Sequence, residues 1–326
     1  MVATVWLCPG QGAQKVGMGK DLAARFPAAR ALFETVDAAL GVPLSRLMFE
    51  GPEDELTATH NAQPAILAHT AAVFAVVGPA LGATAVAAAG HSLGEYSAYV
   101  TAGALAPADA AVLVRRRGEL MHQAGRERPG TMAAVLGLAA EEVEAVCREV
   151  AAAGGVVVAA NLNAPDQTVI SGEPEAVARA GEGCRARGAK RVLPLKVSGA
   201  FHSPLMAPAA AALHRALEAA PFRDPAFPVI ANATAEPVCT AAAARRLLAE
   251  QLTAPVRWVA CMQRAAALAR VAGQAGCAGN GAGGGARFVE IGPGAVLAGL
   301  LRRIVPEAEV VSLGTADEVA RFLATA

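Results

Sequence analysis

The residues best suited to chemistry form the short segment Gly90-His91-Ser92-Leu93-Gly94. A glycine stands two positions before and two positions after the serine, which is the Gly-x-Ser-x-Gly pattern of a nucleophile elbow. In an elbow, a sharp turn between a strand and a helix exposes one hydroxyl at the positive end of the helix. An apolar run precedes this segment and a helical pattern follows it. Ser92 is therefore the predicted nucleophile of a covalent mechanism.

A histidine that could activate this serine lies far along the chain, in Gly-Ala-Phe-His-Ser-Pro. Ser203 is a favourable N-cap and Pro204 a favourable first helical residue. His202 would thus lie in a fixed loop directly before a helix, which suits a catalytic base. The remaining histidines that carry no such signal, and are expected to have no role, are His60, His122 and His214.

Arg117 stands out because of the helix face it occupies. At about 100° per residue, a helix over residues 107–121 places it on an apolar face with Leu113, Val114 and Leu120, opposite Arg115. A buried guanidinium is costly unless an anion pairs with it. Two anions are possible: an internal Asp or Glu, or a carboxylate on the substrate.

The first loop, residues 9–14, carries two glycines directly after a predicted strand. A dinucleotide fingerprint would need a third glycine where Lys15 stands, so nucleotide binding is disfavoured. Beside a serine elbow, such a loop can instead bring a backbone N–H to a carbonyl oxygen and form part of an oxyanion hole.

Composition limits the class of protein. The 326 residues are 54% hydrophobic and 17% charged, with 28 basic and 28 acidic side chains. A sizeable core is expected, disorder is not, and no net charge attracts nucleic acid or an anionic membrane. The six cysteines lack metal-binding spacing, so we expect mostly buried, reduced thiols, no metal and a cytoplasmic protein without a signal peptide. A structural disulfide is the less favoured alternative.

The middle of the chain could be mistaken for a membrane span, because residues 56–94 contain no charged side chain. Polar residues, Pro79 and Gly82 interrupt the run, whereas a span needs roughly 20 apolar residues in a row. A buried helix at 63–77 and a buried strand at 84–89 explain it better.

The remaining pattern predicts an α/β protein with a second, inserted unit. Residues 132–197 contain strands and helices in the order βαββαβ, which is typical of a ferredoxin-like domain. The seven glycines of 272–285 indicate a mobile surface loop. The large unit is predicted to have strands at 3–8, 84–89, 228–231, 287–291 and 310–313, and helices at 21–36, 52–56, 63–77, 95–104, 107–121, 204–219, 241–252, 258–270, 296–304 and the C-terminus.

With these motifs in order, the chain resembles the malonyl-CoA:acyl carrier protein transacylases of fatty-acid and polyketide biosynthesis. The matching stretches cover almost the whole length: residues 9–14, 63–65, 90–96, 117–121, 199–206, 255–258 and 290–297. The resemblance implies an α/β-hydrolase-like large domain with a parallel sheet at 1–127 and 199–326, and a ferredoxin-like small domain at 128–198.

The resemblance also implies ping-pong acyl transfer from malonyl-CoA to the phosphopantetheine thiol of an acyl carrier protein, with no cofactor and by a monomer. Bulky Phe201 before the histidine and Leu93 after the nucleophile resemble malonyl-selective rather than methylmalonyl-selective members. The implied roles are Ser92 as nucleophile, His202 as base, the backbone carbonyl of Gln251 as its orienting group, Gln11 and Leu93 as oxyanion donors, Arg117 as the carboxylate ligand, and Met121, Phe201, His91 and Gln63 as further substrate-binding residues.

Alternative functions remain open. A serine esterase or thioesterase could use the same elbow, with an acid between the serine and the histidine; Asp109, Asp166 and Glu173 are available. A transacylase for another extender unit, such as methylmalonyl, is a third possibility, and a scaffold with an inactive site is a fourth.

Overall fold

The computed structural model describes residues 2–275 and 286–325. Its main feature is a six-stranded sheet with the order β10-β9-β1-β2-β7-β8. Every neighbouring pair is parallel except β7 with β8, which is antiparallel. The strands are β1 (Ala3–Cys8), β2 (Ala85–Gly90), β7 (Val229–Ile230), β8 (Pro237–Val238), β9 (Ala286–Ile291) and β10 (Glu309–Leu313). The expected α/β fold with a largely parallel sheet is confirmed.

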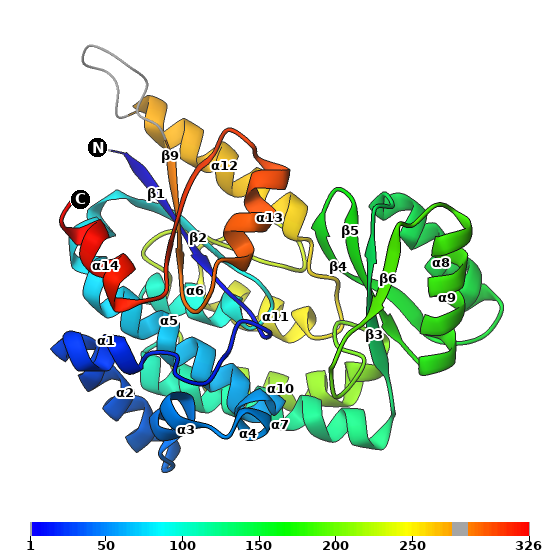
Figure 1. Ribbon diagram of the computed structural model, residues 1–326, viewed down its shortest axis with the longest axis horizontal. Coiled ribbons are helices and arrows are strands. Elements are labelled where there is room, and N and C mark those ends of the chain that lie inside the picture. Colours follow the sequence, from blue (N-terminus) through cyan, green and yellow to red (C-terminus); the bar gives the residue numbers. More distant parts are fainter. Residues whose placement is uncertain (1, 276–285, 326) are drawn as a thin grey trace.

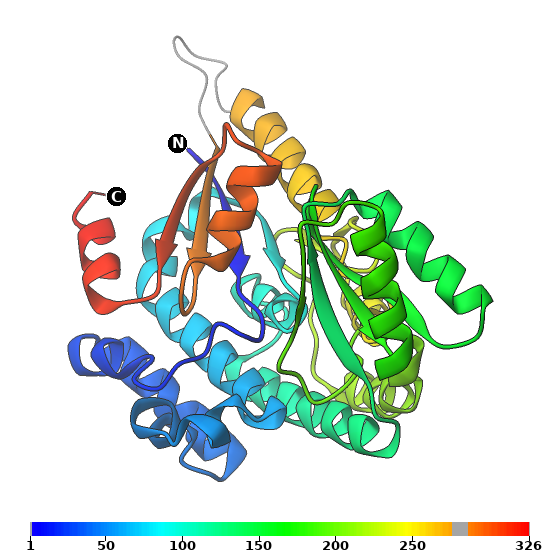
Figure 2. The same cartoon turned by 45° about the vertical axis from the view of Figure 1, so that its right-hand side comes forward.

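Both faces of this sheet are covered, which explains why its central strands are apolar without alternation. Trp6 and Cys8 of β1 join the larger core, whereas Val5 and Leu7 join the second core. Helices α12 (Trp258–Ala275) and α13 (Val296–Ile304) cover the second face (Figures 1 and 2). The larger core is built on α1 (Lys20–Arg25), α2 (Pro27–Leu40), α3 (Leu44–Glu50), α4 (Glu53–Thr57), α5 (Thr59–Leu81), α6 (Gly94–Thr101), α7 (Pro107–Glu127), α10 (Ala207–Ala219), α11 (Ala241–Gln251) and α14 (Ala316–Leu323).

Helix α5 is the long uncharged helix of the sequence. In the described part of the chain, it is the one helix that is long and apolar enough to cross a membrane, but 72% of the qualifying window is buried inside the protein. It lies against α2, α6 and α7 beneath the sheet, as Figure 1 shows. Its apolar character is therefore explained by its place in the core.

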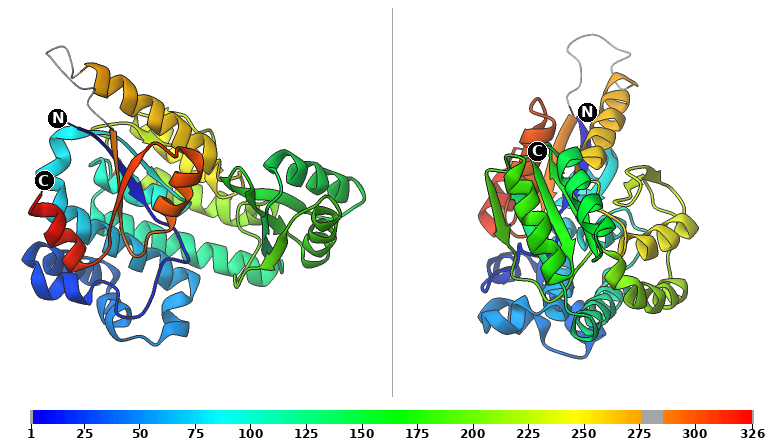
Figure 3. Two further views of the ribbon diagram at one scale, coloured as in Figure 1. Left: turned by 45° about the horizontal axis from the view of Figure 1, so that its top comes forward. Right: turned by 90° about the vertical axis from the view of Figure 1, so that its right-hand side faces the viewer.

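A second sheet has the order β4-β5-β3-β6, with every neighbouring pair antiparallel. Its strands are β3 (Thr131–Leu136), β4 (Val157–Ala164), β5 (Gln167–Gly172) and β6 (Arg191–Pro194). Helices α8 (Ala140–Ala152) and α9 (Pro174–Ala186) pack on one face with their own core. This unit projects from one end of the molecule (Figure 3) and pairs with the main body through Asn161 and Val256.

Several boundaries differ from the predictions, mainly at prolines. The helix expected at 21–36 is two helices, because Phe26 is extended before Pro27. The helix expected at 204–219 begins with a 3-10 turn, Pro204–Met206, before α10. Helix α5 starts earlier, at Thr59, and passes Pro79, which falls in its last turn. Helix α12 includes residues 272–275, and the rest of the predicted loop, 276–285, lies outside the described residues.

Candidate active site

Ser92 lies in a sharp turn between β2 and α6. Its φ is 52°, a left-handed conformation that is strained for serine. A Cβ on Gly90 would come within 1.9 Å of the Gly94 backbone, and one on Gly94 within 2.0 Å of the Cys8 carbonyl oxygen. Both glycines are therefore required by close backbone packing, which is the physical basis of the sequence pattern.

The turn brings Ser92 against His202. The Ser92 Oγ lies 2.7 Å from His202 Nε2, and His202 Nδ1 lies 3.0 Å from the Gln251 carbonyl oxygen and 3.2 Å from that of Ala254. Since a carbonyl oxygen only accepts, Nδ1 carries the proton and Nε2 is free to accept from the serine. The geometry is that of a nucleophile and a general base.

His202 itself is buried and also has a left-handed backbone, with φ 56°. Ser203 accepts a hydrogen bond from the Leu205 N–H, so the predicted N-cap is confirmed. Burial, followed by the nearby Arg117 charge, lowers the pKa of His202 to about 3. The imidazole is therefore neutral at physiological pH, as a base must be.

The first loop lies against the elbow. The His91 N–H donates to the Cys8 carbonyl oxygen at 3.0 Å, and a Cβ on Gly10 would come within 2.4 Å of the His91 carbonyl oxygen. Within residues 2–275 and 286–325, the backbone N–H groups of Gln11 and Leu93 donate no hydrogen bond. Leu93 directly follows the nucleophile and Gln11 directly follows Gly10, which packs on the elbow, and free N–H donors in such places are what an oxyanion hole requires.

Arg117 is 1% exposed and points at the nucleophile from α7. Its Nη2 lies 3.1 Å from Ser92 Oγ and 3.0 Å from Gln251 Oε1, while Nη1 donates to Gln63 Oε1 at 2.7 Å. Its Nε has no partner among the described residues, and no carboxylate of that part of the chain forms an ion pair with it. The internal ion pair that the sequence left open is thus not found there, and the guanidinium has capacity for an outside anion.

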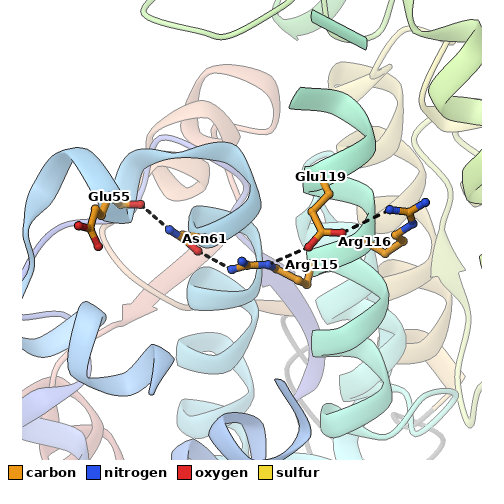
Figure 4. A network of polar contacts seen from close by, with 5 residues as sticks. All are labelled: Glu55, Asn61, Arg115, Arg116 and Glu119. Atoms are coloured by element: carbon orange, nitrogen blue, oxygen red, sulfur yellow. Dashed lines mark hydrogen bonds and ion pairs between the residues drawn. The ribbon is translucent and has the colours of Figure 1, made fainter. Parts of the chain in front are cut away.

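The opposite face of α7 is different. There Arg115 and Arg116 share Glu119, and Arg115 also donates to Asn61, whose amide reaches the Glu55 carbonyl oxygen (Figure 4). These contacts are at the surface, where ion pairs contribute about 0–1 kcal/mol. They account for the outward arginines without any ligand.

Of the other expected substrate-binding residues, Gln63, Met121 and Phe201 lie close to Arg117 or His202, whereas the His91 side chain does not point to them. Gln63 is fully buried: its Oε1 accepts from Arg117 and its Nε2 lies 3.2 Å from Met121 Sδ, so Gln63 supports the Arg117 side chain and Met121 contacts Gln63. Phe201 is buried next to His202. The His91 ring turns away towards the small sheet, where Nε2 lies 2.8 Å from Asn163 Oδ1, and it packs on Trp258.

Three parts of the site were not predicted from the sequence: the side chains of Glu95, Asn232 and Gln251. Glu95 is fully buried, and burial raises its pKa to about 7. Its Oε2 accepts from the Asn232 N–H at 2.9 Å and from Gln251 Nε2 at 2.8 Å. The side chain of Gln251, as well as its carbonyl, is thus part of the site. A charged residue in the apolar elbow helix was the one sequence signal for Glu95.

The acids that a hydrolase triad would need lie elsewhere. Asp166 pairs with Arg303, Glu173 accepts from the Val156 N–H, and Asp109 is in the first turn of α7. Among the described residues, there is no group of three His, Cys, Asp or Glu side chains that could hold a metal ion. The five cysteines of that part, of which Cys239 is exposed, are all free.

Comparison with known proteins defines the class. Residues 5–315 match the acyl transferase domain family. The malonyl CoA-acyl carrier protein transacylase of Bacillus subtilis is 42% identical over 98% of this chain and 96% of the relative, and that of Escherichia coli K12 is 40% identical over 99% of each.

Solved structures agree. The malonyl-CoA:acyl carrier protein transacylase of Xanthomonas oryzae superposes with a TM-score of 0.90 at 38% identity, over 99% of this chain and 98% of that one. A malonyl-transacylase in complex with its type II polyketide synthase acyl-carrier protein gives 0.89 at 40% identity, over 99% and 100%. The chain therefore belongs to the acyl transferase family and, within it, to the malonyl-CoA:acyl carrier protein transacylases.

Proposed function

We propose that this chain transfers a malonyl group from malonyl-CoA to the phosphopantetheine thiol of an acyl carrier protein through an ester on Ser92. The names of its relatives support this reaction. The observation that carries it is the buried Arg117, 3.1 Å from the nucleophile and without a carboxylate partner in the described chain. A planar fork at this position suits an acyl group that ends in a carboxylate.

In the first half-reaction, Ser92 Oγ attacks the thioester carbonyl carbon while His202 Nε2 takes the hydroxyl proton. The N–H groups of Gln11 and Leu93 stabilise the oxyanion, and the Gln251 carbonyl holds the imidazolium through Nδ1. The C–S bond then breaks, and His202 returns its proton to the CoA sulfur as it leaves.

In the second half-reaction, the carrier-protein thiol gives its proton to His202 and attacks the ester carbonyl. The bond to Ser92 Oγ breaks and the serine regains the proton. Acyl and proton transfer balance without any change of oxidation state, so neither a metal nor a redox cofactor is required.

The substrate pocket follows from the same residues. Arg117 binds the malonyl carboxylate, Gln63 holds Arg117 and is itself in contact with Met121, and His91 anchors the elbow to the small sheet. Phe201, with Leu93 after the nucleophile, fills the space that a C2 methyl would need. This selects malonyl over methylmalonyl by about 1–3 kcal/mol, the usual value of a single pocket contact.

Intact-mass measurement tests the function. The protein is mixed with malonyl-, methylmalonyl- or acetyl-CoA, and carrier proteins of fatty-acid and polyketide type are then added. We expect one malonyl group on the wild type, none on Ser92→Ala, and transfer to a carrier protein. Rapid hydrolysis of the acyl-enzyme without transfer would favour a thioesterase, and no acylation at all would favour an inactive scaffold.

The finer architecture is part of the same proposal: an α/β-hydrolase-like domain at 1–127 and 199–326, and a ferredoxin-like domain at 128–198. The two separate sheets and the β4-β5-β3-β6 order of the small one support this division. We also propose a cytoplasmic monomer, which size-exclusion chromatography with light scattering tests.

A further inference from the structure

Glu95 is a buried carboxyl group that the acyl-transfer steps do not use. It lies in the first turn of α6, three residues after the nucleophile, with no exposed surface. One oxygen, Oε2, accepts from the Asn232 N–H and from Gln251 Nε2, whereas Oε1 has no partner among the described residues. A buried carboxylate is costly, so its two contacts need an explanation.

Both contacts lead to the peptide groups of Ser92. The Ser92 N–H donates to Asn232 Oδ1 at 2.7 Å, and the Ser92 carbonyl oxygen accepts from Gln251 Nε2 at 2.9 Å. Asn232 Nδ2 also donates to the Gly90 carbonyl oxygen at 2.7 Å. The strained serine is thus held on both sides by the two residues that Glu95 holds.

Gln251 extends the same network to the base and to the arginine. Its Oε1 accepts from Arg117 Nη2 at 3.0 Å, so its amide lies with oxygen towards a cation and nitrogen towards Glu95. Its backbone carbonyl accepts from His202 Nδ1. A change at Glu95 would therefore reach Ser92, Arg117 and His202 through one residue.

We propose that Glu95 is a positioning residue for acyl transfer: through Asn232 and Gln251, its carboxyl group fixes both the Ser92 turn and the carbonyl that orients His202. This inference rests on the proposed function, because it assigns Glu95 to that reaction. Glu95 touches no reacting atom, so it acts on the acylation rate constant through the positions of Ser92 and His202, and on the malonyl-CoA concentration for half-saturation only through Gln251 and Arg117.

Glu290 provides a matched control. It is also a fully buried carboxyl group, but it accepts from the Leu297 and Ala298 N–H groups at the start of α13 and from Ser312. Its contacts cap a helix and do not reach Ser92, Gln251 or His202. Glu290→Gln should therefore lower Tm while the folded enzyme keeps the wild-type acylation rate.

The experiment compares Glu95→Ala, Glu95→Asp and Glu95→Gln with Glu290→Gln, below the Tm of each variant. Stopped-flow acylation by malonyl-CoA gives the rate constant, and ring ¹⁵N NMR gives the tautomer of His202. The glutamine variant can keep both hydrogen bonds by placing its oxygen where Oε2 lies, whereas alanine cannot and aspartate is too short.

We expect Glu95→Ala and Glu95→Asp to acylate about 10- to 100-fold more slowly, with loss of the pure Nδ1–H tautomer. Glu95→Gln should stay within about fivefold of the wild type, since only the charge is removed.

Wild-type rate and tautomer in Glu95→Ala would overturn the inference, and so would equal slowing by Glu290→Gln. If Glu95→Ala does not fold, the order of the other two decides: a slow aspartate and a fast glutamine support positioning, and any other order overturns it. Failure of the wild type to acylate would instead remove the proposed function, so the two failures are distinguishable.

Discussion

Three consecutive arginines on α7 differ in their surroundings. Arg115 and Arg116 face solvent and share Glu119 (Figure 4), whereas Arg117 is buried beside the nucleophile with glutamines as its partners. On the outward face, carboxylates are close and water screens what remains. On the inward face, the Arg117 guanidinium donates to the neutral amides of Gln63 and Gln251 and lies over the Tyr96 ring, and no carboxylate of the described residues forms an ion pair with it. The guanidinium that forms no direct ion pair within the described residues is thus the one that the proposed function assigns to the malonyl carboxylate.

Arg117→Ala should have the largest effect on activity. The kcat/KM for malonyl-CoA should fall by about 10²–10⁴-fold, because losing one member of a buried ion pair costs ~3–5 kcal/mol. Acetyl-CoA should be affected much less, so competition between the two thioesters is the measurement. An unchanged preference would show that Arg117 has a purely structural role.

The pKa of His202 gives a second test. Burial and then the Arg117 charge lower it to about 3, so the ring should stay neutral from pH 8 to pH 5 in an NMR titration. In Arg117→Ala the second cause is gone and the pKa should rise, whereas in Arg115→Ala it should not move. Protonation of the wild-type ring near its usual pKa of about 6.5 would contradict this account.

Arg117 and Arg115 each donate to a side-chain amide, Gln63 and Asn61 respectively. Gln63→Ala removes the acceptor that positions Arg117 Nη1, and we expect KM for malonyl-CoA to rise about 10-fold, since a hydrogen bond to a charged group contributes ~1.5–3 kcal/mol. Asn61→Ala removes the acceptor of Arg115 and is the matched control. Steady-state kinetics of both variants test this prediction. Similar KM values for the two variants would show that the inward and outward faces of α7 do not differ in substrate binding.

Arg115→Ala should have the smallest effect. Its partners are at the surface, so the free energy of unfolding in urea should change by less than about 1 kcal/mol. Malonyl transfer should stay near the wild-type rate. A large loss of activity would mean that the outward face also binds substrate or carrier protein.

Much of the fold could be predicted because its signals are local. Apolar runs marked β1, β2 and β9, and Ser203 with Pro204 marked the start of a helix. Predictions were wrong where two local rules compete, as at Phe26, where Pro27 divides an otherwise continuous helical pattern. The short β8 and helix α3 gave no pattern strong enough to be predicted.

The elbow, the apolar helix face that carries Arg117 and the family could all be predicted from the order of residues alone. Each depends on residue spacing along the chain: glycines allow the tight backbone turn of the elbow, and the helical period sets which face Arg117 occupies. Two features could be seen only in the folded protein: no carboxylate of the described residues forms an ion pair with Arg117, and Glu95, Asn232 and Gln251 are in contact with one another beside Ser92. Their contacts join residues more than a hundred positions apart, and such pairings are set by packing rather than by local sequence.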